Sequence, residues 1–406
     1  MSRQGQTTRH ADHRLRVARR VEDLSGSSIF RINAKAEKLA GQGRDILRLD
    51  AGEPDFDTPK HIIDAAKQAL DHGYTRYTPV GGLPSLKDAI RHKFKRDNNL
   101  YFDDDEVMHS CGAKQALFNT CMTLLQPMDE IVIPSPHWGT YPSISKIAWA
   151  RIVNAPTYHE HGFVLRPEVL DECLSDRSRI VVLNTPNNPT GQVWSREALS
   201  ALGEVLLDYP DVFVVSDDIY EHLRYTGEPY ANILNVCPSL KERTVVINGV
   251  SKAYAMTGWR VGFAAGPSHL IAEMQQLQGQ STSHTAAVSQ KAAQAALDGG
   301  LDTVHDMASA LSNRAQQVAD GLAEIGAIDC HPAQGSFYCL PNFQRVIASL
   351  DGVDDDQQLG DWLLEELGIA MVPGSAFNAP GHMRLSFAAG SETLGNALER
   401  LQHAFA

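Results

Sequence analysis

Short runs of β-branched and apolar residues, separated by longer amphipathic stretches, constrain the fold of this chain more than any other feature. Each run is apolar at successive positions, which is typical of strands buried on both faces of a mainly parallel sheet. Stretches between them, such as 114–125 and 195–207, have the pattern of helices. The alternation predicts an α/β layered domain that binds its ligands at the carboxyl ends of the strands. The runs are Glu130–Pro134, Arg179–Leu183, Val212–Ser216, Thr244–Asn248 and Val261–Ala265.

The character of the sequence changes after Gly300. A long helical stretch at 301–325 is followed by the segment 335–340, a helical stretch at 361–367 and an apolar run at 383–388. This mixture predicts a smaller α+β domain. A chain of 406 residues is also too long for one hydrophobic core, so two domains are expected.

Lys252 is the most informative residue for predicting the function of this chain. It follows the run 244–248 in a glycine-containing turn, and Arg260 lies at the start of the next apolar run. A lysine at a strand end, in a partly dry site, loses some preference for the charged form, so its amine can attack carbonyl groups. An arginine fork nearby suits a phosphate group. An isolated lysine is usually a solvated surface residue, but a lysine with a phosphate-binding arginine is what pyridoxal phosphate (PLP) requires.

Two further features predict anion sites from the residues alone. The segment Ser110–Ala116 joins a strand to a helix, and the free N–H groups of a helix start attract phosphate. Arg384 stands in an otherwise apolar run. An unpaired arginine there is costly, and a carboxylate ligand for its planar fork would explain its presence.

The stretch Ser251–Gly262 (SKAYAMTGWRVG) resembles the lysine motif of the class I/II aminotransferases, which are fold type I PLP enzymes. Other motifs resemble the family in the same order from residue 27 to the C-terminus, and the bacterial aspartate aminotransferase branch is the most similar. The resemblance implies PLP as the cofactor. It also implies an α/β fold with a mainly parallel mixed sheet in a large domain and a smaller α+β domain. We predict a large PLP-binding domain over 61–299, a small domain formed by 27–60 and 300–406, and a flexible N-terminal arm over 1–26.

The resemblance assigns three residues to the cofactor ring. Asn188, in the segment 184–191 (NTPNNPTG), and Tyr220 are expected to hydrogen-bond the phenolic oxygen, and Asp217 the pyridine nitrogen. Residue type alone leaves other interpretations open, since 184–191 has the composition of a proline-rich turn and Asp217 could cap a helix. The predicted catalytic residues are Lys252, Asp217 and Tyr220.

The phosphate group of PLP is expected to lie on the backbone of Gly112 and Ala113. Many relatives also have a phosphate-binding serine three residues before the lysine, where this chain has Gly249. Either Ser251 takes over that role, or Arg260, Tyr77 and the backbone suffice. In similar enzymes the tyrosine matching Tyr77 reaches the phosphate of the neighbouring subunit, which implies a homodimer with shared sites. The predicted cofactor-binding residues are Gly112, Ala113, Lys114, Trp138, Asn188, Asp217, Tyr220, Ser251, Lys252, Arg260 and Tyr77.

The predicted substrate-binding residues are Arg384, Gly52, Trp138, Asn188 and Lys114. The family match gives Arg384 the substrate α-carboxylate and makes the Gly52 segment close over it. Trp138 is expected to stack on the cofactor ring, although a core tryptophan is the plainer alternative. Lys114 is expected either to contact the distal carboxylate of an acidic substrate or to be a solvated lysine at a helix start.

These residues predict an aminotransferase that moves an amino group from an L-amino acid to a 2-oxo acid such as 2-oxoglutarate, by a ping-pong mechanism. Aspartate is the first candidate donor, with other acidic or aromatic amino acids as alternatives. A C–S lyase or a related β/γ-eliminating enzyme uses the same fold and lysine. Transcription regulators with an aminotransferase-like sensor domain carry a DNA-binding domain before it, and the short segment before Gly52 disfavours that class.

Composition narrows the partners. The net charge of −13 argues against nucleic acids, and no apolar stretch approaches the ~20 residues of a membrane span. The 6 cysteines are scattered, which favours reduced thiols and a cytoplasmic protein over disulfides or a metal site. The expected partners are small amino acids and 2-oxo acids.

Overall fold

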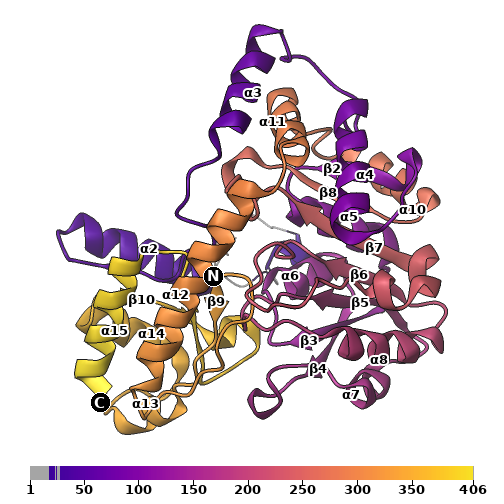
Figure 1. Cartoon of the computed structure of the whole chain (residues 1–406). Coiled ribbons are helices and arrows are strands. Elements are labelled where there is room, and N and C mark those ends of the chain that lie inside the picture. Colours follow the sequence, from indigo (N-terminus) through magenta and orange to yellow (C-terminus); the bar gives the residue numbers. More distant parts are fainter. Residues whose placement is uncertain (1–17, 23, 25–27, 406) are drawn as a thin grey trace, which may run out of the picture.

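The computed structural model describes residues 18–22, 24 and 28–405. Most of the predicted arm 1–26 therefore lies outside the described residues, and its described part contains the short helix α1 (Arg19–Glu22). Figure 1 shows the N-terminal helix α2 (Ser28–Gly41) beside the C-terminal helices, apart from the central sheet.

The central sheet has seven strands in the order β2-β8-β7-β6-β5-β3-β4. All its neighbours are parallel except β8, which runs antiparallel to both β7 and β2. The predicted runs all form strands of this sheet. Two further strands, which lie outside the predicted runs, form its edges, β2 before the helix-start motif and β4 beyond β3. The bounds are β2 Val107–Ser110, β3 Glu130–Ser135, β4 Arg151–Pro156, β5 Ser178–Asn184, β6 Phe213–Asp217, β7 Thr244–Gly249 and β8 Gly262–Ala265.

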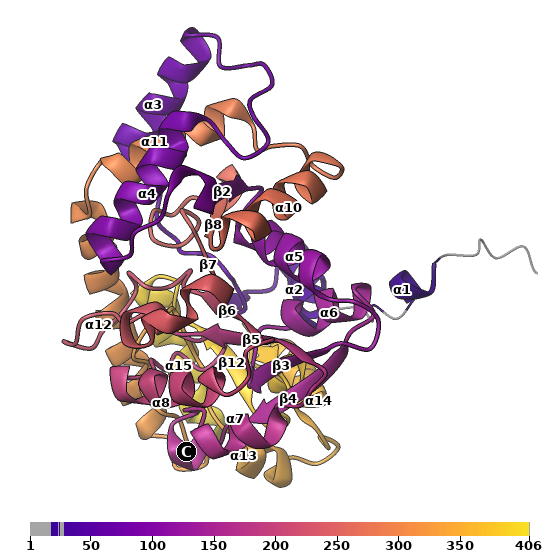
Figure 2. The same cartoon turned by 90° about the vertical axis from the view of Figure 1, so that its right-hand side faces the viewer.

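Helices cover both faces of this sheet (Figures 1 and 2). Successive strand residues point to opposite faces, so Val214 and Val246 enter one core while Val215 and Val245 enter the other. The first core is closed by α4 (Pro84–Asn98), α7 (Pro167–Cys173), α8 (Arg196–Leu207) and α11 (Ala287–Asp298), and the second by α5 (Ala113–Leu124), α6 (Thr140–Ile147) and α10 (Ser268–Gly279). The remaining helices of this part are α3 (Lys60–Asp71) and α9 (Ile233–Val236).

A separate hydrophobic cluster forms around the C-terminal third of the chain, with Leu311, Phe343 and Leu363 at its centre. Two small sheets support it, a parallel pair β1-β10 and an antiparallel sheet in the order β11-β12-β9. The first pair joins a strand at residues 47–48 to a strand at residues 369–370, so an early and a late segment of the chain lie side by side. The elements are β1 (Leu47–Arg48), α12 (Asp302–Ala323), β9 (Tyr338–Cys339), α13 (Gln344–Ser349), α14 (Asp356–Glu366), β10 (Ile369–Ala370), β11 (Val372–Pro373), β12 (Met383–Ser386) and α15 (Ser391–Phe405).

Two predicted boundaries in this part are wrong. Helix α14 begins at Asp356, well before the predicted 361, because the side chain of Asp355 caps it by accepting from Gln358 N at 2.8 Å. Strand β12 ends at Ser386, before the predicted 388. The division into domains at 27–60, 61–299 and 300–406 stays a prediction.

Candidate active site

A cavity of about 330 Å³ lies at the carboxyl ends of β5, β6 and β7. Its wall combines the ends of these strands with side chains of the small sheets, such as Arg384 on β12 and Tyr338 on β9. Most predicted site residues line this cavity, and Gly112 and Tyr77 do not. Those that line it are Gly52, Ala113, Lys114, Trp138, Asn188, Asp217, Tyr220, Ser251, Lys252, Arg260 and Arg384.

Lys252 is presented by the turn that follows β7. Its Nζ donates a hydrogen bond of 2.5 Å to the carbonyl of Gly52. Burial is the main reason why the pKa of this amine falls to about 8; the carboxylate of Glu53 opposes the shift, and the cations of Arg384 and Arg260 add to it. A lysine with such a pKa is partly neutral near neutral pH, and the neutral amine is the nucleophilic form.

Asp217 ends β6 next to this turn. Tyr141 OH donates to its Oδ2 at 2.7 Å, and Ile219 N donates to its Oδ1 at 3.4 Å. Burial raises the pKa of Asp217 to about 6, while the bond from Tyr141 opposes that shift. Residues 219–222 form turns, so no α-helix starts here and the alternative of a helix cap finds no support.

A phosphate-sized anion has a natural place at the start of α5. Gly112 precedes this helix with a φ of 83°, a conformation that favours glycine. A Cβ at Gly112 would also collide with the guanidinium of Arg260. Arg260 donates to Thr257 O at 2.8 Å, which holds its fork in place. Helix N–H groups and a guanidinium therefore converge where a phosphate would be bound by both.

Gly249 explains one departure from the family pattern. A Cβ at this position would lie 2.9 Å from Val261 O and 3.1 Å from Gly262 Cα. A serine would not fit there without movement of the backbone of the neighbouring strand. Ser251, two residues further on, lines the cavity instead.

Arg384 is 3% exposed and pairs with no carboxylate in the described part of the chain. Its Nη1 donates to Asn188 Oδ1 at 3.2 Å and its Nη2 to Asp50 O at 3.0 Å. Its guanidinium lies over the rings of Tyr338 and Phe377, at 4.3 and 4.8 Å from their centroids. Its Nε is buried without a hydrogen-bond partner among the described residues. A buried cation with an unused donor fits a carboxylate ligand.

Lys114 and Trp138 face each other at the cavity. The Nζ of Lys114 lies 4.9 Å from the centroid of the Trp138 ring. Burial of its amine lowers the pKa of Lys114, and Arg260 lowers it further, while the residue as a whole remains exposed. Trp138 also meets Tyr141 edge to face at 5.7 Å and packs against the core behind the sheet. It thus combines a core contact with a position in the cavity wall.

Tyr220 and Tyr77 have opposite environments. Tyr220 is buried, and burial together with the neighbouring Tyr338 raises its pKa well above the ordinary value. Tyr77 is 92% exposed and touches His284 edge to face at 5.7 Å. Within one chain Tyr77 does not reach the cavity, and its assignment to a neighbouring subunit stays a prediction.

Several cavity residues escaped the sequence analysis. Tyr141, within the segment 139–143 (GTYPS), and Tyr338, beside Phe337, carry no charge or motif in the sequence that would mark them as site residues. Asn184 lies in the motif that contains Asn188, and its Nδ2 donates to Asp217 O at 2.9 Å. Asp50 also lines the cavity. In the sequence, only its position two residues before Gly52 indicates that it lies near the site.

Comparisons with known proteins agree with this geometry. The family model for aminotransferase class I and II matches residues 44–401. An aspartate/prephenate aminotransferase of Nitrosomonas europaea is 44% identical over 95% of this chain and 99% of its own length. An aspartate aminotransferase of Bacillus subtilis is 41% identical over 96% of this chain and 98% of its own.

Solved structures give the same result. The aspartate aminotransferase of Rhizobium meliloti matches with a TM-score of 0.93 at 40% identity, over 96% of this chain and 98% of its own. The Thermus thermophilus aspartate aminotransferase with maleate matches with a TM-score of 0.90 at 39% identity, over 96% and 99%. This chain therefore belongs to the class I and II aminotransferase family. The resemblance seen in the sequence and the predicted α/β fold with a mixed, mainly parallel sheet are confirmed.

Proposed function

We propose that this aminotransferase depends on PLP and moves an amino group from L-aspartate, or from another acidic or aromatic L-amino acid, to a 2-oxo acid such as 2-oxoglutarate. The observation that carries the proposal is that the Lys252 amine, the Asp217 carboxyl group and the Arg384 guanidinium line one cavity. The relatives named aspartate and aspartate/prephenate aminotransferases support this choice of substrates. They also favour amino-group transfer over the β-eliminating alternative.

The residues of the cavity fit PLP. Lys252 has a low pKa and would hold the aldehyde covalently, and Asp217 would pair with the pyridine nitrogen. Asn188 and Tyr220 would bind the phenolic oxygen. When bound, PLP withdraws electrons from the bonds of the substrate α-carbon. The phosphate would lie between Arg260, Ser251 and the backbone of Gly112 and Ala113, with Trp138 against the ring.

Substrate binding is assigned to the opposite wall. Arg384 would bind the α-carboxylate, since its buried guanidinium has an unused Nε donor. The hydrogen bond from its Nη1 to Asn188 Oδ1 would hold the Asn188 side chain beside the bound carboxylate. Lys114, which lines the same cavity as Arg384, would face the distal carboxylate of an acidic donor. The Thermus relative was solved with maleate, a dicarboxylate, which supports a site for two carboxylates.

Lys252 is also placed to move protons. The pKa of its amine is about 8. The amine can therefore take the α-proton of a substrate as a general base and return a proton as a general acid. The carbonyl of Gly52 accepts its hydrogen bond and would keep the amine on the substrate side of the cavity.

We further propose a cytoplasmic homodimer. Exposure of Tyr77 supports a site completed by a second subunit. The two cores on the faces of the central sheet and the separate cluster around the C-terminal third support a large PLP-binding domain at 61–299 and a small domain at 27–60 and 300–406. In the described part of the chain, the helices are too short or too polar to cross a membrane.

The proposal is tested by supplying a panel of L-amino acids with 2-oxoglutarate and measuring glutamate. Aspartate should be among the best donors, and product should require the oxo acid. Ammonia release without an oxo acid would instead indicate elimination. Lys252→Ala should lose nearly all transfer and the visible absorbance of bound PLP, and transfer at the wild-type rate in this variant would refute the assignment.

A further inference from the structure

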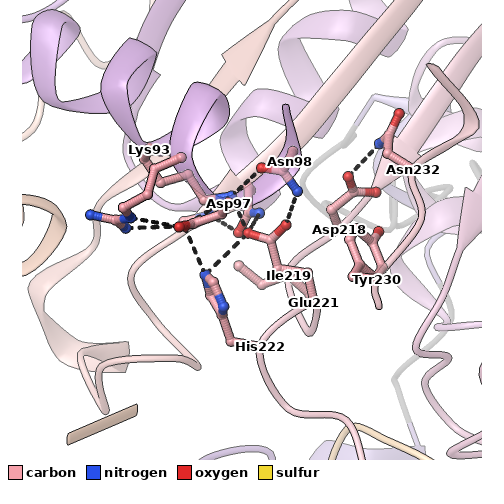
Figure 3. A network of polar contacts seen from close by, with 12 residues as sticks. Lys93, Asp97, Asn98, Asp218, Ile219, Glu221, His222, Tyr230 and Asn232 are labelled. Carbon is pink, nitrogen blue, oxygen red and sulfur yellow. Dashed lines mark hydrogen bonds and ion pairs between the residues drawn. The ribbon is translucent and has the colours of Figure 1, made fainter. Parts of the chain in front are cut away.

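A buried carboxylate outside the cavity joins the two turns that carry the candidate catalytic residues. Glu221 lies one residue beyond Tyr220 on the turn after β6 and does not line the cavity. Its side chain is 2% exposed. Figure 3 shows it among polar side chains of α4, with its neighbour His222 beside it. A buried charge of this kind requires an opposite charge and hydrogen bonds.

Helix α4 provides both. The Nζ of Lys93 forms an ion pair with Oε1 of Glu221, and both side chains are 2% exposed. The Nδ2 of Asn98 donates to Oε2 of Glu221 at 2.5 Å. Lys93 Nζ also donates to Asn98 Oδ1 at 2.6 Å, so the three side chains close a triangle. The turn after β6 is thereby fixed to the end of α4.

A second connection runs from Glu221 to β7. The Nδ2 of Asn248 donates to Oε1 of Glu221 at 2.7 Å. The Oδ1 of Asn248 accepts from Gly249 N at 2.7 Å, and Gly249 opens the turn that leads to Lys252. One carboxylate therefore links the turn of Asp217 and Tyr220 to the turn of Lys252, and both to α4.

The same region could be mistaken for a metal site. Asp97, Glu221 and His222 each offer a ligand atom, and these atoms lie within 4.8 Å of one another. However, Lys93 already pairs with Glu221, and Arg96 Nε donates to Asp97 at 2.6 Å. A divalent cation bound here would be repelled by the charges of Lys93 and Arg96, or would have to displace these side chains from the carboxylates. The arrangement is better explained as an ion-pair network.

We infer that Glu221 is a positioning residue: through Asn248 and Lys93 it sets the placement of Lys252 relative to Asp217 and Tyr220, while touching neither substrate nor cofactor. The inference rests on the proposed function, because that function gives these three residues one shared ligand. Its physical basis is that a catalytic group must be held by a supporting shell within a fraction of an ångström.

The first test uses Asn248→Ala, which cuts the link and leaves the Lys93–Glu221 pair intact. Asn119→Ala is the matched control, because Asn119 is also fully buried and also donates one hydrogen bond, to Gln278 Oε1 at 3.0 Å, but lies in neither turn. Amide hydrogen exchange is followed on the cofactor-free protein. In Asn248→Ala, residues 217–222 and 248–254 should both exchange faster, and in Asn119→Ala neither should. An effect confined to 248–254, or none, overturns the link.

The second measurement is PLP affinity, obtained by titrating cofactor-free protein. Asn248→Ala should weaken binding about tenfold, the lower end of the loss seen when a supporting partner of a metal ligand is removed. Asn119→Ala should bind as the wild type does. Equal affinities for both variants would contradict the positioning role. If the wild type itself does not bind PLP, the proposed function fails, while the exchange data still decide whether the two turns are linked.

A double variant separates positioning from stability. Lys93→Met with Glu221→Met replaces the buried pair by apolar side chains of similar volume, an exchange that is often neutral or stabilising. The buried amides of Asn98 and Asn248 lose their acceptor in this variant, so we expect a folded protein with a thermal midpoint below that of the wild type, together with weaker PLP binding. A stable double variant with wild-type affinity would overturn the inference. If it does not fold, the Asn248→Ala comparison decides.

Discussion

The hydroxyl of Tyr141 donates a hydrogen bond of 2.7 Å to Oδ2 of Asp217. Tyr141 lies in α6, and Asp217 ends β6 on the central sheet. Burial alone would favour the neutral acid, and this bond favours the anion. Helix α6 therefore helps to keep a negative charge at the position where the proposed function needs one.

Tyr141→Phe should reduce kcat for transfer about tenfold, because a hydrogen bond to a charged group contributes about 1.5–3 kcal/mol. Without the bond the pKa of Asp217 should rise above its value of about 6. The acidic limb of the pH profile of kcat should then move to higher pH. A profile that keeps its position would show that Tyr141 does not act through this carboxyl group.

Arg384→Lys should lower kcat/KM for aspartate at least about thirtyfold, since loss of one partner of a buried charge pair costs about 2–5 kcal/mol. Lysine cannot reproduce the planar fork that the rings of Tyr338 and Phe377 hold in place. PLP affinity should change little, because Arg384 is assigned to the substrate. Steady-state kinetics and a cofactor titration check the two halves, and a matching loss of PLP affinity would contradict the assignment.

Lys114→Met should raise KM for aspartate about tenfold and leave KM for phenylalanine unchanged, because only the first has a distal carboxylate. One solvent-accessible charge-assisted contact accounts for about this factor. The methionine keeps the contact with Trp138 that Lys114 makes at 4.9 Å from the ring centroid. Unchanged KM for aspartate would remove Lys114 from the substrate site.

His109 should make the folded protein less stable in mild acid. Burial lowers its pKa to about 4, and it accepts a hydrogen bond from Thr285 N at 3.2 Å, which requires a neutral ring. The unfolded chain binds a proton below its ordinary pKa of about 6.5, while the folded ring does not. The contribution of His109 to the free energy of unfolding is therefore fully present above the ordinary pKa of about 6.5 and is lost as the pH falls toward 4. The loss between pH 7 and pH 5 should be about 2 kcal/mol.

Urea unfolding at pH 7 and pH 5 measures this loss, with His109→Gln as the comparison. Glutamine can still accept from Thr285 N but cannot titrate, so its loss between the two pH values should be about 2 kcal/mol smaller. Burial lowers the pKa of His137, His159 and His382 in the same direction, so part of the loss should remain. Equal losses in both proteins would contradict the role of His109.

Gly249→Ser should destabilise the protein by about 1–3 kcal/mol, the usual cost of overpacking. Its Cβ would press on Val261 O at 2.9 Å. Gly227→Ser is the control, since nothing lies within 4 Å of a Cβ built there. Thermal melts of both variants give the comparison, and equal midpoints would show that the strand yields to the serine.

The central strands of the sheet could be predicted from the sequence, whereas the edge strand β4 and some element boundaries could not. Strands such as Val214–Ser216 are buried on both faces, so their apolar run marks them clearly. Strand β4 lies at the sheet edge and exposes Arg151 and Asn154, which weakens the same signal. The start of α14 was missed because Asp355 and Asp356 have the composition of a loop, and only their capping geometry shows a helix.

The candidate site divides in a similar way. Lys252, Asp217 and Arg384 stand out because charged residues beside apolar runs need a reason to be there. Tyr141 and Tyr338 give no such contrast, and only the packing of α6 and β9 brings them to the cavity. Tyr77 is proposed to act at the site of a second subunit, and the position of that subunit does not follow from one sequence.

The joining of an N-terminal strand to a C-terminal one in the β1-β10 pair has a consequence for synthesis. During translation Asp217 and Lys252 emerge well before Arg384, and β1 must wait for its partner strand β10, which is made late in the chain. A ribosome-bound nascent chain can thus complete the central sheet and still lack the wall that would recognise a substrate carboxylate. Nascent chains arrested before β10 should already bind cofactor and remain unable to select amino acids.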